Sequence, residues 1–350
     1  MRKIRITENL KEMADEYKEI ILSSPHMEGV HISPLNRLKT LKKKFDDGRV
    51  QEYIGKDGEG RDTYQPLADG TSFSAYIQEI IDSLADNLLT IKPSEIGEII
   101  DHFNDLLLED RLSADLKVGR NGKKKKFWEI IVNQMMYSEV RRLVFPQYIR
   151  RQDIKSCVYC NGNYTITDKD GIAYYDLDHW KPKSKYPYLC ISFFNLQPCC
   201  HSCNMHKSDD DEHEYMGLYS DDPAELLDMF SLTIDDSDVA NYLTDHDKAG
   251  LRIHFNSLNS RYDTVCHDMN EQLHIENIYQ EHQDVAEEVI WRKMIYNDSF
   301  QESLKNLLME RNFTDEEIDR FILGSYFEEK DIHKRPLTKL IQDVFKSCDV

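Results

Sequence analysis

Two Cys-x-x-Cys pairs constrain this chain more than any other feature. Cys157-Val-Tyr-Cys160 and Cys200-His-Ser-Cys203 each place two thiols on a short turn. Such half-sites come together around a tetrahedral zinc ion and fill its four ligand positions. A plain zinc ribbon separates its pairs by about 15 to 20 residues, whereas 39 residues lie between Cys160 and Cys200. The spacing therefore predicts a structural zinc site that encloses further secondary structure.

The enclosed segment carries polar residues that suit hydrolytic chemistry. Asp178 and His179 end an expected strand that begins at Tyr174, and Asn195 opens an Asn-Leu-Gln-Pro segment before the second cysteine pair. A neutral imidazole can take a proton from water near neutral pH. Carboxylate and amide oxygens suit a hard divalent ion. The order in which these residues follow one another decides which roles they can be assigned.

The order of these motifs is similar to that of a known nuclease superfamily. Residues 157–207 read Cys-x-x-Cys, Asp-His, Asn-Leu-Gln-Pro and Cys-x-x-Cys-Asn-x-x-Lys, which resembles the HNH, or His-Me finger, endonucleases with an accessory zinc. The resemblance implies a ββα-metal fold in which His179 is the general base. It also implies that Asn195 holds the loop that orients this histidine.

The resemblance further implies a catalytic Mg²⁺ or Mn²⁺ ion held by Asp178 and Asn204. Asn204 stands where many members of the superfamily have a histidine. His201 and His206 lie within one helical turn of Asn204, so they stay open as substitute ligands. The Zn²⁺ at the four cysteines is expected to be saturated and to act in folding only.

The charge distribution bears on the partner. The chain has a net charge of −20, which by itself argues against nucleic acid. Residues 1–140 carry 21 basic and 25 acidic side chains, residues 208–350 carry 13 and 34, and residues 141–207 carry 10 and 5. The motif segment is therefore the basic part of the chain.

Four lysines of the motif segment are expected to contact nucleic acid: Lys181, Lys183, Lys185 and Lys207. A solvated loop is the alternative for them. The runs Lys42–Lys44 and Lys123–Lys126 are interpreted without a function, as a helix face and an exposed helix start.

Outside the motif the sequence is mainly helical. Apolar periodicity predicts helices over residues 73–88, 96–107, 127–145 and 285–295, and a capping box at Thr314 begins another. Residues 48–70 are rich in glycine and charge, which predicts a loop or a small irregular hairpin. Alternating apolar residues at 251–255 predict a strand.

The expected fold class is α+β, a mainly helical protein with a small central ββα-metal finger stapled by zinc. The expected division is a helical N-terminal region (1–146), an HNH core (147–212) and an acidic, mainly helical C-terminal region (213–350). Repulsion from nucleic acid makes this last region a candidate surface for a protein partner or for autoinhibition.

The predicted function is metal-dependent hydrolysis of phosphodiester bonds in DNA, with RNA left open as a substrate. More loosely, the arrangement resembles bacterial defence-associated HNH proteins, including those paired with an ATPase. The alternatives are a zinc-containing module that only binds nucleic acid, and a regulatory protein with a decayed nuclease core. With no secretory signal and no long apolar run, a cytoplasmic location is expected, and a homodimer stays open.

Overall fold

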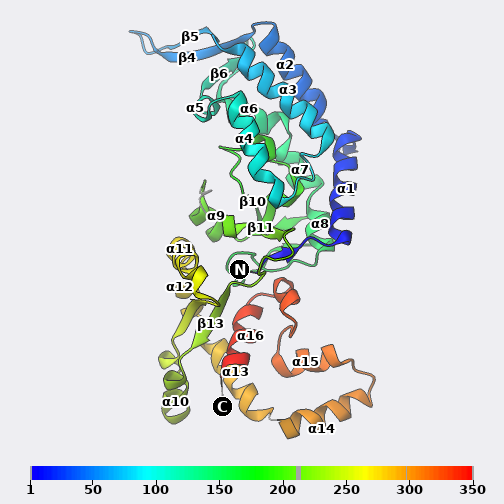
Figure 1. The fold of residues 1–350 in the computed structure, drawn as a ribbon, viewed down its shortest axis with the longest axis vertical. Helices are drawn as coiled ribbons and strands as arrows, with labels where there is room; N and C mark the ends of the chain where they lie inside the picture. Colours follow the sequence, from blue (N-terminus) through cyan, green and yellow to red (C-terminus); the bar gives the residue numbers. More distant parts are fainter. Residues whose placement is uncertain (1, 210–213, 297, 349–350) are drawn as a thin grey trace.

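The computed structural model describes residues 2–209, 214–296 and 298–348. The molecule is elongated, with the N-terminal helices at one end, the segment that holds the two cysteine pairs in the middle, and the C-terminal helices at the other end (Figure 1). Helices make up about 53% of the structure and strands about 16%. The expectation of a mixed, mainly helical protein is therefore confirmed.

The N-terminal part combines helices with a four-stranded antiparallel sheet in the order β5-β4-β6-β7. Its elements are β1 (Ile4–Arg5), α1 (Glu8–Leu22), β2 (His26–Met27), β3 (Val30–His31), α2 (Pro34–Asp46), β4 (Val50–Lys56), β5 (Asp62–Pro66), α3 (Gly70–Asp86), α4 (Ile96–Leu106), α5 (Glu109–Leu112), β6 (Asp115–Val118) and β7 (Lys124–Lys126).

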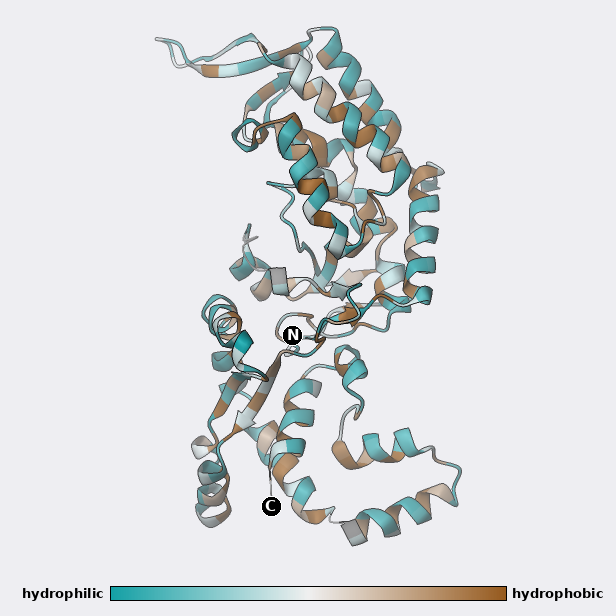
Figure 2. Ribbon diagram, viewed as in Figure 1, coloured by the Kyte–Doolittle hydropathy of each residue, from teal (hydrophilic) through white to brown (hydrophobic). Residues whose placement is uncertain are grey.

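Both helices expected in this part are present as α3 and α4. Phe73, Ile77 and Ile80 of α3 are fully buried, as their helical spacing predicts, and Figure 2 shows hydrophobic and hydrophilic residues alternating along α3 and α4. The segment expected to be a loop or a small hairpin forms the β4–β5 hairpin.

The single helix predicted over residues 127–145 is wrong. The structure divides this stretch into α6 (Phe127–Gln134) and α7 (Tyr137–Leu143), followed by α8 (Pro146–Arg151). Met136 adopts a left-handed conformation with a φ of 58°, which a continuous helix does not accommodate. Apolar periodicity continues across the break because both helices bury one side, so it does not reveal the change of direction.

The middle part contains short strands and one helix: β8 (Ile166–Thr167), β9 (Ala173–Tyr174), β10 (Asp176–His179), β11 (Leu196–Cys199), α9 (His201–Lys207) and β12 (Tyr219–Ser220). The strand expected from Tyr174 is interrupted at Tyr175 between β9 and β10. The expected solvated boundary at residues 208–212 lies partly outside the described residues.

The C-terminal part contains β13 (Phe230–Ile234), α10 (Asp236–Asp245), β14 (Ile253–Ser257), α11 (Asp263–Leu273), α12 (Ile275–Gln280), α13 (Gln283–Ile295), α14 (Asp298–Met309), α15 (Asp315–Leu323) and α16 (Thr338–Ser347). Three expectations are confirmed here. β14 pairs with β13, α13 covers the predicted helix, and Thr314 caps α15 together with Glu317.

Contacts cross the two expected region boundaries. β1 pairs in parallel with β12, which lies beyond residue 212. The imidazole Nε2 of His333 lies 2.8 Å from the carbonyl oxygen of Arg2, and the backbone N–H of Leu337 donates to the carbonyl of Asn161 at 2.7 Å. The chain ends thus pack on the middle part. Within the described residues, no helix has the length and apolar character needed to cross a membrane.

Candidate active site

The four cysteines of the two pairs come together at one point. Their sulfur atoms all lie within 4.8 Å of one another, and the Sγ atoms of Cys160 and Cys200 are 4.0 Å apart. Four sulfurs at about 2.3 Å from a tetrahedral zinc lie about 3.8 Å from each other. The cluster therefore fits a zinc ion by both ligand type and spacing.

Backbone N–H groups also point at these sulfurs. Cys200 donates to the Sγ of Cys157 at 3.3 Å, and Gly162 donates to the Sγ of Cys160 at 3.4 Å. Burial raises the pKa of the Cys157 thiol, whereas hydrogen bonds from the neighbouring cysteines lower the pKa of Cys200. N–H donors around thiolates are the usual outer support of a metal site.

The second cysteine pair lies within a ββα unit, at the start of its helix. β10 and β11 are antiparallel, with Asp176 opposite Cys199 and His179 opposite Leu196, and α9 follows with Cys200 as its N-cap. Side chains alternate along a strand, so Asp176 and Asp178 share one face of β10 while His179 points to the other. His179 lies at the end of its strand, where the next loop begins.

His179 is held in one tautomer. Its side chain is buried, and Nε2 lies 3.0 Å from the carbonyl oxygen of Cys190. A carbonyl only accepts, so Nε2 carries the proton and Nδ1 keeps its lone pair. Among the described residues no group hydrogen-bonds Nδ1, and the Tyr137 ring packs beside the imidazole with centroids 4.5 Å apart.

Burial lowers the pKa of His179 to about 3, and the nearby positive charge of Lys183 acts in the same direction. The imidazole is therefore neutral at neutral pH. Nδ1 of this neutral ring keeps the lone pair that accepts a proton, while the low pKa makes the buried ring a weaker base than a free imidazole.

Asn195 fixes the loop that follows His179. Its Oδ1 accepts from the backbone N–H of Lys181 at 2.7 Å, and its Nδ2 donates to the carbonyls of Lys181 and Leu189 at 3.1 Å. The side chain is fully buried. Because Leu189 directly precedes Cys190, these three bonds also position the carbonyl that holds the His179 ring.

The expected metal ligands have different partners. The carboxylate of Asp178 accepts from the hydroxyl of Tyr159 and lies 3.2 Å from the Nζ of Lys207. Asn204 instead donates from Nδ2 to the Oδ2 of Asp176 at 3.0 Å. The structure thus joins Asn204 to Asp176, and not to Asp178.

Asp176 also brings in His201, one of the substitute ligands left open above. The Nδ1 of His201 lies 2.8 Å from the Oδ2 of Asp176, and Arg141 lies 3.3 Å from the other oxygen. Burial acts to raise the pKa of Asp176, but hydrogen bonds from His201 and Asn204 and the charge of Arg141 outweigh it and lower the pKa. An ionised carboxylate, an amide and an imidazole therefore lie together, and this donor set suits a divalent ion.

His206 lies elsewhere on α9. Its ring packs against that of His274, with centroids 5.1 Å apart. Sequence reasoning missed Asp176 and Tyr159. The position of Asp176 two residues before Asp178, on the same face of one strand, is the signal that could have found it.

The four expected nucleic-acid lysines differ in exposure. Lys207 is 1% exposed and donates from Nζ to the carbonyl of His179 at 2.9 Å, so it supports the site from inside. Lys181 is also buried, with its ammonium 5.2 Å from the Trp180 ring centroid. Lys183 and Lys185 are half-buried and remain within reach of a ligand.

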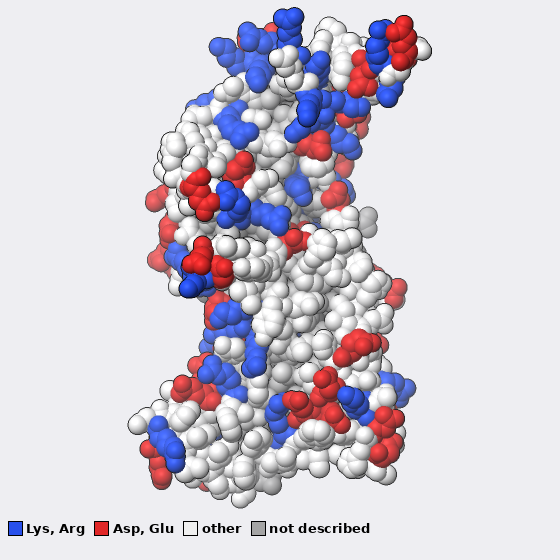
Figure 3. All heavy atoms as spheres, turned by 180° about the vertical axis from the view of Figure 1, so that it is seen from behind, with Lys and Arg blue, Asp and Glu red and all other residues white. Residues whose placement is uncertain are grey.

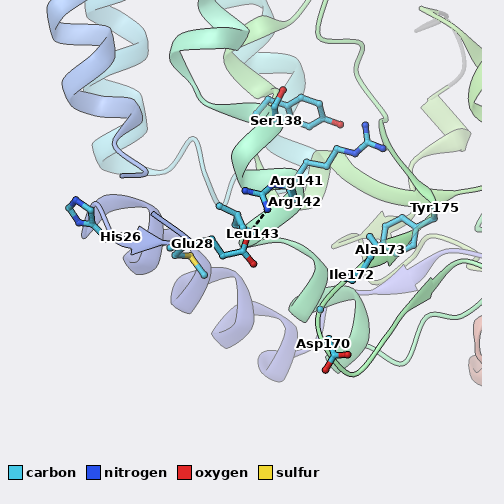
Figure 4. Close-up of a pocket in the computed structure, with 13 residues that line it drawn as sticks. His26, Glu28, Ser138, Arg141, Arg142, Leu143, Asp170, Ile172, Ala173 and Tyr175 are labelled. Carbon is cyan, nitrogen blue, oxygen red and sulfur yellow. Dashed lines mark hydrogen bonds and ion pairs between the residues drawn. The ribbon is translucent and has the colours of Figure 1, made fainter. Parts of the chain in front are cut away.

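A cavity of about 940 Å³ lies on the Tyr137 side of His179. The tip of the β2–β3 hairpin, α7 and the turn between β8 and β9 line it. Figure 4 shows Arg141 extending toward Tyr175, and Arg142 paired with Glu28 at one side. Tyr137 and Arg141 thus belong both to this cavity and to the surroundings of β10.

Comparison of the chain with protein-family models, curated proteins and solved structures finds no match. The function of the chain is therefore inferred from its residues and their geometry.

Proposed function

We propose that this protein is a metal-dependent endonuclease of the HNH type that hydrolyses phosphodiester bonds in DNA. The observation that carries the proposal is the orientation of the buried His179 ring, whose Nε2 is fixed by the Cys190 carbonyl so that Nδ1 keeps its lone pair. It lies at the end of a β-hairpin that is closed by a helix and a four-cysteine cluster.

The chain's own residues can prepare a water molecule for attack. His179 accepts the proton from water at Nδ1, while its Nε2–H stays on the Cys190 carbonyl. Asn195 holds both ends of the intervening loop, so the ring keeps its direction during the transfer. The ammonium group of Lys207 donates to the carbonyl of His179 and is paired with the Asp178 carboxylate. It therefore links the backbone of the proposed base to a side chain on the opposite face of β10.

We assign the proposed hard divalent ion to the face of β10 that carries Asp176 and Asp178. Asp178 and Asn204 are the ligands that the resemblance implies, and Asp176 and His201 supply further donors beside Asn204. The chemistry that Mg²⁺ or Mn²⁺ supplies when bound is stabilisation of negative charge on the phosphate and on the leaving oxygen. Zn²⁺ fits the four cysteines and has no open position there.

One observation favours the alternative of a zinc-containing module that only binds nucleic acid. His179 is 3% exposed, as a structural histidine would be. Tyr137, which covers the ring and lines the neighbouring cavity, would have to move for a substrate phosphate to approach. The nuclease hypothesis predicts that DNA is cut, and the binding-module hypothesis predicts that it is only bound.

The proposed biological setting, anti-phage defence in bacteria with an ATPase or another protein partner, follows from the looser resemblance alone. The acidic C-terminal region is proposed to receive such a partner.

The test is cleavage of supercoiled plasmid and of single-stranded RNA by purified, zinc-loaded protein with Mg²⁺, with Mn²⁺ and without either ion. Metal-dependent nicking or linearisation supports the proposal. Cleavage of RNA alone would correct the substrate. Folded protein that binds DNA and cuts neither substrate would contradict the proposal and favour the binding module.

A further inference from the structure

Two lysine runs that lie far apart in the sequence meet at the N-terminal end of the molecule. α2 carries the first, and the β6–β7 hairpin carries the second. The backbone N–H of Gly119 donates to the carbonyl of Arg49 at 2.8 Å, and Val50 pairs with Val118. Residues 34–49 and 115–126 together hold twelve Lys and Arg side chains and three Asp, in a chain whose net charge is −20.

This cationic surface has a cavity at its centre. The cavity measures about 220 Å³ and is lined by Lys44 of α2, Lys123 and Lys125 of the hairpin, and uncharged residues of α2, β6 and α6. Alternation along β7 explains the arrangement, because Lys124 turns to the other face and lies 3.7 Å from the Tyr53 ring centroid. Among the described residues that line the cavity there is no Asp or Glu.

The lysines of this surface differ in their ion pairs. Lys42 pairs with Asp46 at 2.8 Å, and Lys124 lies 3.9 Å from Asp115. Lys44, Lys123 and Lys125, by contrast, form no ion pair with any residue that the structure describes. Like charges gathered in this way repel one another, and an anion between them removes the repulsion.

An amide adds hydrogen-bonding capacity. Gln134 lines the same cavity, and its Oε1 accepts from the Nε of Arg37 at 3.4 Å. Its two amide N–H groups are therefore donors toward a ligand. Three ammonium groups and an amide donor suit a phosphate group.

Near His179, Lys181 and Lys207 are buried, and the exposed Arg141 and Arg142 are paired with Asp176 and Glu28. Figure 3 shows Lys and Arg side chains gathered instead over the end of the molecule that α2 and the β4–β7 sheet form. Affinity for a polyanion depends on the phosphates that cations neutralise, so lysines with no ion pair among the described residues can contribute more to binding than the paired arginines near His179.

We propose that the Lys44, Lys123 and Lys125 cavity, with the lysine surface around it, binds backbone phosphates of duplex DNA away from His179 and anchors the DNA for cleavage. The identity of the polyanion rests on the proposed function. The site itself rests on the lysines.

The test is the affinity of the full-length chain for a fluorescent DNA duplex of about 40 base pairs, measured by anisotropy without Mg²⁺ over a series of salt concentrations. The variant is Lys44→Gln with Lys123→Gln and Lys125→Gln. The matched control replaces three exposed lysines elsewhere, Lys11→Gln, Lys248→Gln and Lys330→Gln, and has the same net charge.

The proposal predicts that the cavity variant loses at least about tenfold in affinity at 0.1 M salt, and that its salt slope falls by about 0.9 for each lost phosphate contact. The control is expected to bind like the wild type. Melting temperature and zinc content should be unchanged in both variants, because the substituted side chains lie at the surface.

Equal affinity and slope in wild type and cavity variant would overturn the proposal, and so would an equal loss in the control. The proposal would also be overturned if the wild-type protein did not bind DNA and instead bound anionic vesicles or dimerised through these lysines. The His179→Ala variant distinguishes this proposal from the proposed nuclease activity. It keeps the three lysines and should therefore bind the duplex with wild-type affinity, whether or not the wild type cuts DNA.

Discussion

Replacing Asn195 by alanine tests whether the loop after His179 orients the imidazole. The change removes three buried hydrogen bonds, one from the N–H of Lys181 and two to the carbonyls of Lys181 and Leu189. At about 1 kcal/mol net for each bond, the free energy of unfolding should fall by about 3 kcal/mol. Domains with about 5 to 15 kcal/mol of stability stay folded after such a loss.

Cleavage should fall further than stability explains. Without Asn195 the loop that ends at Cys190 is free to shift, and the Cys190 carbonyl is the group that holds Nε2 of His179. A displacement of about 1 Å in a reacting group can lower a rate about 100-fold. We therefore expect about a 100-fold slower plasmid nicking at a temperature where the variant is fully folded by circular dichroism.

Asn161 provides a matched control. It is also fully buried, donates to Ser156 and Ile332, and accepts from the N–H of Lys339. Its φ of 53° calls for Asn161→Gly, since glycine tolerates this conformation. This variant should lose similar stability and keep its cleavage rate. If Asn195→Ala cut plasmid as fast as Asn161→Gly, the orienting role of the loop would be refuted.

Further predictions concern zinc, the buried ion pair and pH. Cys203→Ser should lose zinc and unfold the segment around the four cysteines, because structural zinc supplies on the order of 10 kcal/mol. The control Cys199→Ser, at a buried cysteine outside the cluster, should keep its zinc. Equal zinc content of the two variants in a colorimetric assay would contradict Cys203 as a zinc ligand. Lys207→Met leaves the Asp178 carboxylate buried without its cation, so urea unfolding should show a loss of about 3 to 5 kcal/mol, and a loss below about 1 kcal/mol would speak against the pair. Burial lowers the pKa of His333 from 6.5 to about 4. Between these two pH values the unfolded chain binds a proton at His333 and the folded chain does not. The free energy of unfolding is therefore undiminished above pH 6.5 and falls as the pH is lowered toward 4. Relative to His333→Gln, the wild type should lose about 3 kcal/mol between pH 7 and pH 4, and a constant difference would show that His333 does not titrate in this way.

The four-cysteine cluster was predictable because each of its halves is encoded by a short stretch of sequence. Each Cys-x-x-Cys turn presents two sulfurs by itself, and only the meeting of the two turns needed the fold. Helices α3 and α4 were predictable for a similar reason, since each buries one continuous face. The break at Met136 was not, because the left-handed residue changes the direction of the chain without interrupting its apolar pattern.

The partners of the metal-ligand candidates depend on how α9 packs on β10, which sequence does not encode locally. Asn204 therefore meets Asp176, while Asp178 meets Lys207. The burial of Lys207 also depends on this packing, and the sequence does not distinguish a lysine that is buried from one that is exposed.

The cationic surface at the N-terminal end was not predictable from the sequence because its two parts are distant in the chain. The runs 42–44 and 123–126 lie about 80 residues apart, and each alone is typical of a solvated face. Only the pairing of β4 with β6 brings them around one cavity.

The most direct test of the central claim is plasmid cleavage by His179→Ala beside His102→Ala, an exposed histidine that pairs with Glu79 far along the chain from the motif. Both variants should keep zinc and fold. Wild type and His102→Ala should nick the plasmid in a metal-dependent way, and His179→Ala should nick it about 100-fold more slowly or not at all. Nicking at the wild-type rate by a folded His179→Ala would contradict the assignment of His179 as the base.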